Sequence, residues 1–122
     1  MHDMKNQSFA ARLRYALAGL VHAAATERSL RTQLFAFAFV IAALAWLRPA
    51  PLWWALVLLA SGAVLAAELL NTAIEGLADL LQPHHHAQVR VLKDCAAAAV
   101  LVQSLAALCV AAALAYELWR SR

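Results

Sequence analysis

The amino-acid sequence predicts an all-α integral membrane protein with one amphipathic helix at the membrane interface and three transmembrane helices. Of its 122 residues, 65% are hydrophobic and only 14% are charged, whereas a soluble domain is about 45–50% apolar. The apolar residues fall in long runs separated by short polar segments, and Gly and Pro number three each. At this length we expect one domain, residues 1–122, without a separate soluble module.

The first expected element is a helix over residues 8–28. Apolar side chains recur there at helical spacing, while Arg12, Arg14 and His22 lie largely off that stripe. Because the rest of the chain is membrane-like, we expect this helix to lie in the membrane interface, with packing in a core as the alternative. The N-terminal segment lacks the apolar core of a secretory signal, so we expect the first apolar run to be retained.

Three predicted membrane spans follow. The first, residues 31–48, is short and needs polar flanks near the interface to cross about 30 Å of hydrocarbon. The segment RPAP at residues 48–51, bracketed by tryptophans, predicts a non-helical corner at the outer interface. The second span, residues 52–81, is longer than the hydrocarbon thickness. A loop over residues 82–94 and a third span over residues 95–117 complete the predicted architecture.

The positions of the basic residues predict the orientation in the membrane. Seven of the ten Lys and Arg residues lie before the first span or in the predicted loop before the last one. The positive-inside rule therefore puts the N-terminus and that loop in the cytoplasm. No basic stripe is interleaved with aromatic residues, so nucleic acid is not an expected partner.

Four polar side chains interrupt the second span: Glu68, Asn71, Glu75 and Asp79. At about 100° per residue they fall within an arc of roughly 80°, so they share one helix face. A carboxylate at membrane depth costs at least about 2.5 kcal/mol unless it is paired or ligated. The row therefore predicts a functional site, while a polar seam between helices or a proton or ion relay remains the alternative.

Other charged residues at the same predicted depth make phosphoryl transfer the favoured chemistry. Glu27 and Asp94 add carboxylates, which are ligands that Mg²⁺ prefers together with phosphate oxygens and water. A further carboxylate can act as general base for a hydroxyl, and Lys93 offers a cation for phosphate. The three glycines are too dispersed for a P-loop. A kinase on this chain must therefore bind ATP without that motif.

Three sequence blocks resemble those of the prokaryotic diacylglycerol kinase family. ELLNTAIEGLAD at residues 68–79 resembles its signature, KDCAAAAV at residues 93–100 its second block, and TERSLR at residues 26–31 its N-terminal element. The blocks occur in the order of the family. The resemblance implies an ATP- and Mg²⁺-dependent lipid kinase of the bacterial inner membrane that converts diacylglycerol to phosphatidic acid at the cytoplasmic face. It also implies a homotrimer with active sites shared between subunits.

The resemblance also implies roles for individual residues. Glu68 is the expected catalytic base for the lipid hydroxyl, and Glu27 and Glu75 are the expected Mg²⁺ ligands, which also contact the phosphates. The remaining expected ATP-binding residues are Tyr15, His86, Lys93 and Asp94. The expected residues that orient the lipid hydroxyl or support the site are Asn71, Asp79 and Arg31.

The chain departs from the family pattern at several positions. Ser8 stands where family members carry an arginine, so either Arg12 or Arg14 replaces that contact or the contact is missing. Gln33 occupies the position of a second carboxylate found in some members. The three histidines at residues 84–86 are expected to contact nucleotide or to lie in a solvated loop rather than to bind metal.

Three alternative functions remain open from the sequence. Within the same family the lipid acceptor could be undecaprenol, because the hydroxyl chemistry is the same. A non-enzymatic membrane subunit could use Glu68 and Glu75 as a proton or ion relay, without dependence on nucleotide. A catalytically inactive homologue is the third possibility, and the substitutions at Ser8 and Gln33 keep it open.

Overall fold

The computed structural model describes residues 6–82, 84 and 86–122, and helices account for nearly all of them. In chain order the helices are α1 (Phe9–Thr26), α2 (Arg28–Leu47), α3 (Pro51–Leu81) and α4 (Ala87–Arg120). The described residues contain no strand. Helices α2, α3 and α4 are each long and apolar enough to cross a membrane. The predicted all-α class with three candidate spans is therefore confirmed.

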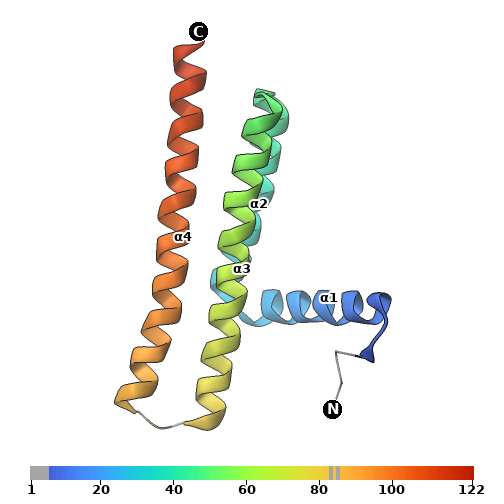
Figure 1. Ribbon diagram of the computed structural model, residues 1–122, viewed down its shortest axis with the longest axis vertical. Coiled ribbons are helices and arrows are strands. Elements are labelled where there is room, and N and C mark those ends of the chain that lie inside the picture. The colour runs from blue at the N-terminus through green and yellow to red at the C-terminus, as the bar shows by residue number, and fades with distance from the viewer. Residues whose placement is uncertain (1–5, 83, 85) are drawn as a thin grey trace.

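The three long helices run side by side, and α1 lies crosswise to them (Figure 1). Helix α3 packs against both α2 and α4, and α1 contacts α2 and α3. The crosswise direction of α1 agrees with the predicted interfacial helix, because a helix in the membrane plane lies across helices that span it. The hairpin of α3 and α4 extends past the level of α1 (Figure 1).

Local capping sets both ends of α1. Ser8 is its N-cap, and the Ser8 hydroxyl accepts a hydrogen bond of 3.2 Å from the backbone N–H of Ala11. Glu27 adopts an extended conformation with φ −110° and ψ 115°, which ends α1 and starts α2 at the next residue. The turn between α1 and α2 is thus a single residue wide. Ser8 therefore has a structural role as the N-cap of α1, at the position where family members are expected to carry an arginine.

The corner between α2 and α3 matches the prediction from the RPAP segment. Arg48 adopts the left-handed conformation with φ 52° and ends α2. Pro51 occupies the first turn of α3, where its missing N–H has no helical partner to lose and its fixed φ suits the helix. The chain reverses direction within three residues, so α2 and α3 are antiparallel neighbours.

Helix α4 begins at Ala87, eight residues before the predicted third span, and the predicted loop is therefore wrong over residues 87–94. The polar sequence of that segment suggested a loop, but Ala, Gln, Leu, Lys and Arg are strong helix formers. His86 caps the new N-terminus, because its Nδ1 accepts a hydrogen bond of 3.2 Å from the Gln88 N–H. Lys93 and Asp94 consequently lie on a helix.

Little of the chain is buried within the single subunit. Leu30 and Leu44 are the largest fully buried side chains, whereas many Leu, Phe and Trp side chains on all four helices are exposed. Gln103 of α4 donates a 3.4 Å hydrogen bond to the backbone carbonyl of Ala60 in α3, as expected for a polar residue between membrane helices. The exposed apolar faces suit contact with lipid or with other membrane helices.

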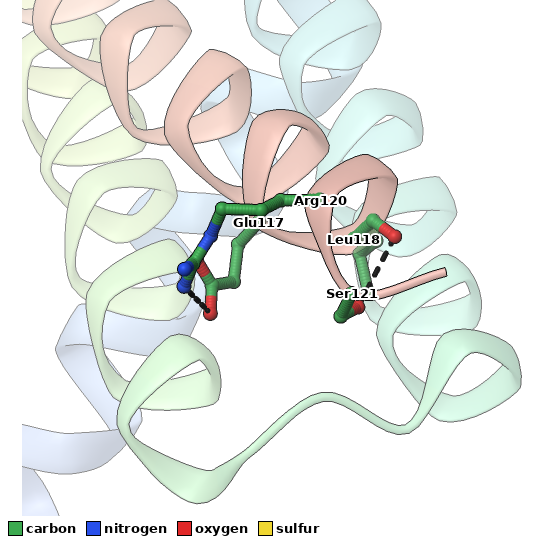
Figure 2. Close-up of polar contacts among 4 residues, drawn as sticks. All are labelled: Glu117, Leu118, Arg120 and Ser121. Carbon is green, nitrogen blue, oxygen red and sulfur yellow. Dashed lines mark hydrogen bonds and ion pairs between the residues drawn. The ribbon is translucent and has the colours of Figure 1, made fainter.

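The C-terminal end of α4 carries a local ion pair, far along the helix from the hairpin loop. Arg120 approaches both carboxylate oxygens of Glu117, with its Nη2 at 2.8 and 2.9 Å (Figure 2). The Ser121 hydroxyl donates to the carbonyl of Leu118 in the same turn. The contacts of Glu117 are confined to the C-terminal end of α4, so its carboxylate serves as a control for the carboxylates of α3.

Candidate active site

The four polar residues on α3 become more exposed along the helix. Glu68 is 6% exposed, Asn71 and Glu75 are half-buried, and Asp79 is exposed. The helix is continuous from Pro51 to Leu81, so the shared face predicted from the spacing is retained. The row rises about 16 Å along the axis, since each residue adds 1.5 Å. One helix face therefore connects a buried carboxylate to an exposed one.

Glu68 lies against the first turn of α2. The hydroxyl of Ser29 donates a 3.2 Å hydrogen bond to Oε2 of Glu68 across 39 residues of sequence. Ser29 follows the single-residue turn at Glu27, which places Glu68 at the level where α1 meets the long helices. A buried carboxylate at that level can meet a lipid head group and a water-soluble reactant.

Arg31 in α2 connects α2 to the C-terminal end of α1. Nη1 of Arg31 donates to the carbonyl oxygens of Ala24 and Ala25 at 3.0 and 3.1 Å. These carbonyls belong to the last turn of α1, where no further helical N–H groups are available. Arg31 was expected to support substrate binding. The structure gives it a contact with the C-terminal end of α1.

Asn71 and Glu75 form the middle of the polar row. Nδ2 of Asn71 lies 3.5 Å from Oε1 of Glu75, and this contact orients the carboxamide so that its oxygen points away from the carboxylate. Oδ1 of Asn71 is buried and has no hydrogen-bond partner among the described residues. Carboxylate and carboxamide oxygens are both hard donors of the kind that Mg²⁺ prefers, but Oδ1 of Asn71 and the Glu75 carboxylate do not face each other.

This fit to Mg²⁺ is incomplete within one chain. Within the described ranges, no group of three His, Cys, Asp or Glu side chains lies close enough to hold a metal ion. Mg²⁺ bound with a nucleotide usually takes only one or two protein carboxylates, and phosphate oxygens and water supply the rest. Glu75 on α3 could supply one such carboxylate to a metal that arrives with a nucleotide. Glu27, the other predicted ligand, is half-buried at the α1–α2 turn.

At the outer end of the row, Asp79 is paired across the hairpin. Nζ of Lys93 on α4 lies 2.6 Å from Oδ1 of Asp79. The pair borders a polar hollow of about 120 Å³ between α3 and α4. The hollow is lined by Asp79, Gln82, His84, His86, Val89, Arg90 and Lys93. Cations and imidazole rings that converge there could bind phosphate groups.

The other residues predicted to bind nucleotide lie near the start of α4 (His86 and Asp94) and on α1 (Tyr15). His86 lines the hollow, and because its Nδ1 accepts the capping hydrogen bond, a neutral ring carries its proton on Nε2. His85 lies outside the described residues. Asp94 pairs with Arg90 on the same helix at 3.3 Å. Tyr15 is half-buried on α1, and the Arg14 guanidinium lies 5.6 Å from its ring centroid.

Two contacts join residues that were both predicted for the site: Asn71 with Glu75, and Asp79 with Lys93. Glu68 instead contacts Ser29, which the sequence did not single out. Ser29 lies inside the TERSLR block, but nothing in that block assigns the serine a partner. The contact with Glu68 depends on the turn at Glu27, whose geometry is not apparent from residue types alone. A serine two positions after Glu27 is a weak signal by itself.

Fold and site together define a small helical membrane protein with a buried carboxylate where an interfacial helix meets a bundle of membrane helices. The model of the prokaryotic diacylglycerol kinase family matches residues 14–115. The chain therefore belongs to this family, and the resemblance inferred from the three sequence blocks is confirmed.

Two curated relatives are similar to the chain over different lengths. A diacylglycerol kinase of Synechocystis sp. is 40% identical over 102 residues, which cover 83% of this chain and 58% of that protein. An undecaprenol kinase of Bacillus subtilis is 45% identical over 49 residues, which cover 40% of each chain. The chain thus spans little more than half the length of the first relative.

Proposed function

We propose that the protein is an ATP- and Mg²⁺-dependent lipid kinase that phosphorylates diacylglycerol to phosphatidic acid at the cytoplasmic face of the bacterial inner membrane. The observation that carries the proposal is the buried carboxylate of Glu68 at the level of α1. Family membership and a relative named diacylglycerol kinase support the same reaction. The seven basic residues predicted on one side support the orientation.

Glu68 is the proposed general base. As the lipid hydroxyl oxygen bonds to the γ-phosphorus of ATP, Glu68 accepts the hydroxyl proton, and the bond from phosphorus to the ADP oxygen breaks. Burial of the carboxylate keeps bulk water away from the reacting hydroxyl, which limits hydrolysis of ATP. Asn71, one turn away, orients the hydroxyl or the transferred phosphoryl group.

The nucleotide is proposed to extend from Glu75 toward the hairpin. Glu75 and Glu27 would hold Mg²⁺, which when bound would offset the negative charge of the phosphates. Lys93, positioned by Asp79, contacts phosphate oxygens at the polar hollow, and His86 donates from Nε2. The rise of about 16 Å along α3 leaves room for the nucleotide to extend from the hairpin toward Glu68, where its γ-phosphate meets the lipid hydroxyl.

Tyr15 and Asp94 are proposed to complete nucleotide binding in a homotrimer with shared sites. The exposed apolar side chains on all the long helices support association of this kind. Completion of the site by a neighbouring subunit would also account for the wide separation of the predicted ligands along one chain. A shared site requires that subunits with complementary defects restore activity when mixed.

Undecaprenol is the second candidate acceptor, because the Bacillus relative is named undecaprenol kinase. Transfer of labelled phosphate from ATP to diacylglycerol and to undecaprenol should be compared in the same mixed micelles with Mg²⁺. We expect a higher kcat/KM for diacylglycerol. A higher kcat/KM for undecaprenol would reassign the acceptor, and no transfer to either lipid would contradict the kinase function.

A further inference from the structure

The hydroxyl side chains around the α1–α2 turn make two kinds of contact. Thr26 donates to the carbonyl of His22 at 3.0 Å, and Thr32 donates to the carbonyl of Arg28 at 3.2 Å. Both are contacts to the carbonyl four residues earlier, the common local alternative for a helical hydroxyl. Ser29 instead reaches another helix and donates to Glu68.

The contact of Ser29 restricts a flexible side chain at the position proposed for chemistry. A glutamate has three side-chain torsions, and the last of them is broadly populated. A hydrogen bond to Oε2 selects one orientation of the carboxylate plane and occupies one of its oxygens. The other oxygen, Oε1, is then the one available to a substrate hydroxyl.

We propose that Ser29 is a positioning residue for the base Glu68: its hydroxyl holds Oε2 and thereby directs Oε1 toward the lipid hydroxyl. This inference rests on the proposed lipid kinase function. It also connects the base to the membrane surface, because Ser29 and Arg31 share the first turns of α2, and Arg31 holds the end of α1. The orientation of the base is thus linked to that of the interfacial helix.

Replacement of the hydroxyl tests the inference. For Ser29→Ala we expect kcat to fall about tenfold to a hundredfold, the range for a lost hydrogen bond to a charged group. KM for the lipid and for MgATP should stay within about twofold, because the bond orients the base and does not bind either substrate. Ser29→Thr keeps the hydroxyl and should retain at least about a third of the wild-type kcat.

Thr32→Val is the matched control, since it removes a hydroxyl one turn away that contacts only backbone. Its kcat should stay within about twofold of wild type. The effect of Ser29→Ala should also depend on Glu68. In a Glu68→Asp background the shortened carboxylate withdraws from Ser29, so Ser29→Ala should then change kcat by less than about twofold.

The outcomes separate this inference from the proposed function. If the wild-type protein transfers no phosphate to either lipid, the kinase function fails and the role of Ser29 fails with it. If the wild type is active and Ser29→Ala keeps kcat within about twofold, only the positioning role is overturned. An increase in KM with unchanged kcat, or an equal loss in the Glu68→Asp background, would overturn it as well.

Discussion

Arg31 is predicted to hold α1 against the bundle, and Arg31→Met removes its guanidinium while most of the aliphatic stem is kept. Nη1 makes two hydrogen bonds, of 3.0 and 3.1 Å, to carbonyls in the last turn of α1. Because the side chain is exposed, each bond is worth only about 0.5 kcal/mol. A cation at a helix C-terminus adds about 0.3–1 kcal/mol. The expected loss is therefore about 1–2 kcal/mol of local stability.

Hydrogen exchange measured by mass spectrometry tests this value. A loss of 1–2 kcal/mol corresponds to opening of α1 that is about five- to thirtyfold more frequent. Amides of α1 should exchange faster by that factor in Arg31→Met, whereas amides in the centre of α3 should not change. Arg28→Met is the control, because it removes a second exposed arginine in the first turn of α2. Equal exchange of α1 in Arg31→Met and Arg28→Met would refute the role assigned to Arg31.

Three further predictions concern other contacts. Glu75→Gln should raise the Mg²⁺ concentration for half-maximal rate about tenfold, with the lipid KM unchanged, because one of the two proposed carboxylate ligands loses its charge. An unchanged Mg²⁺ titration would contradict this. Lys93→Met should raise KM for MgATP at least about tenfold, because it removes the proposed phosphate contact. Asp79→Asn loses only an exposed ion pair and should raise this KM about two- to threefold. Equal effects of the two variants would contradict a direct contact between Lys93 and phosphate. Gln103→Leu should lower stability to denaturant by less than about 1 kcal/mol and leave kcat unchanged, since hydrogen bonds between membrane helices average about 0.6 kcal/mol.

The elements of the fold were largely predictable from the sequence, because hydropathy in a membrane protein acts over long runs of residues. The corner at residues 48–50 followed from its prolines, and the shared face of the polar row followed from its spacing. The start of α4 did not follow. Helix α4 begins at Ala87, eight residues before its apolar run, and the low hydropathy of these first two turns predicted a loop where the chain is helical.

The candidate site was predictable in its residue types but only partly in its contacts. Pairing of Asn71 with Glu75 follows from their separation by four residues on one helix. Pairing of Lys93 with Asp79 depends on the length of the hairpin, and that of Ser29 with Glu68 depends on the single-residue turn at Glu27. Both of these contacts arise from how helices meet, which no local pattern encodes.

The most direct test of the proposed chemistry is the kcat for phosphate transfer from ATP to the lipid acceptor in Glu68→Gln, compared with Glu117→Gln. Both variants neutralise one glutamate, but Glu117 lies in the ion pair at the far end of α4 (Figure 2). We expect Glu68→Gln to lower kcat at least about a hundredfold with nucleotide binding retained, as for loss of a general base. Glu117→Gln should stay within about twofold of wild type. A Glu68→Gln variant with a kcat close to that of Glu117→Gln would contradict the assignment of Glu68 as the base.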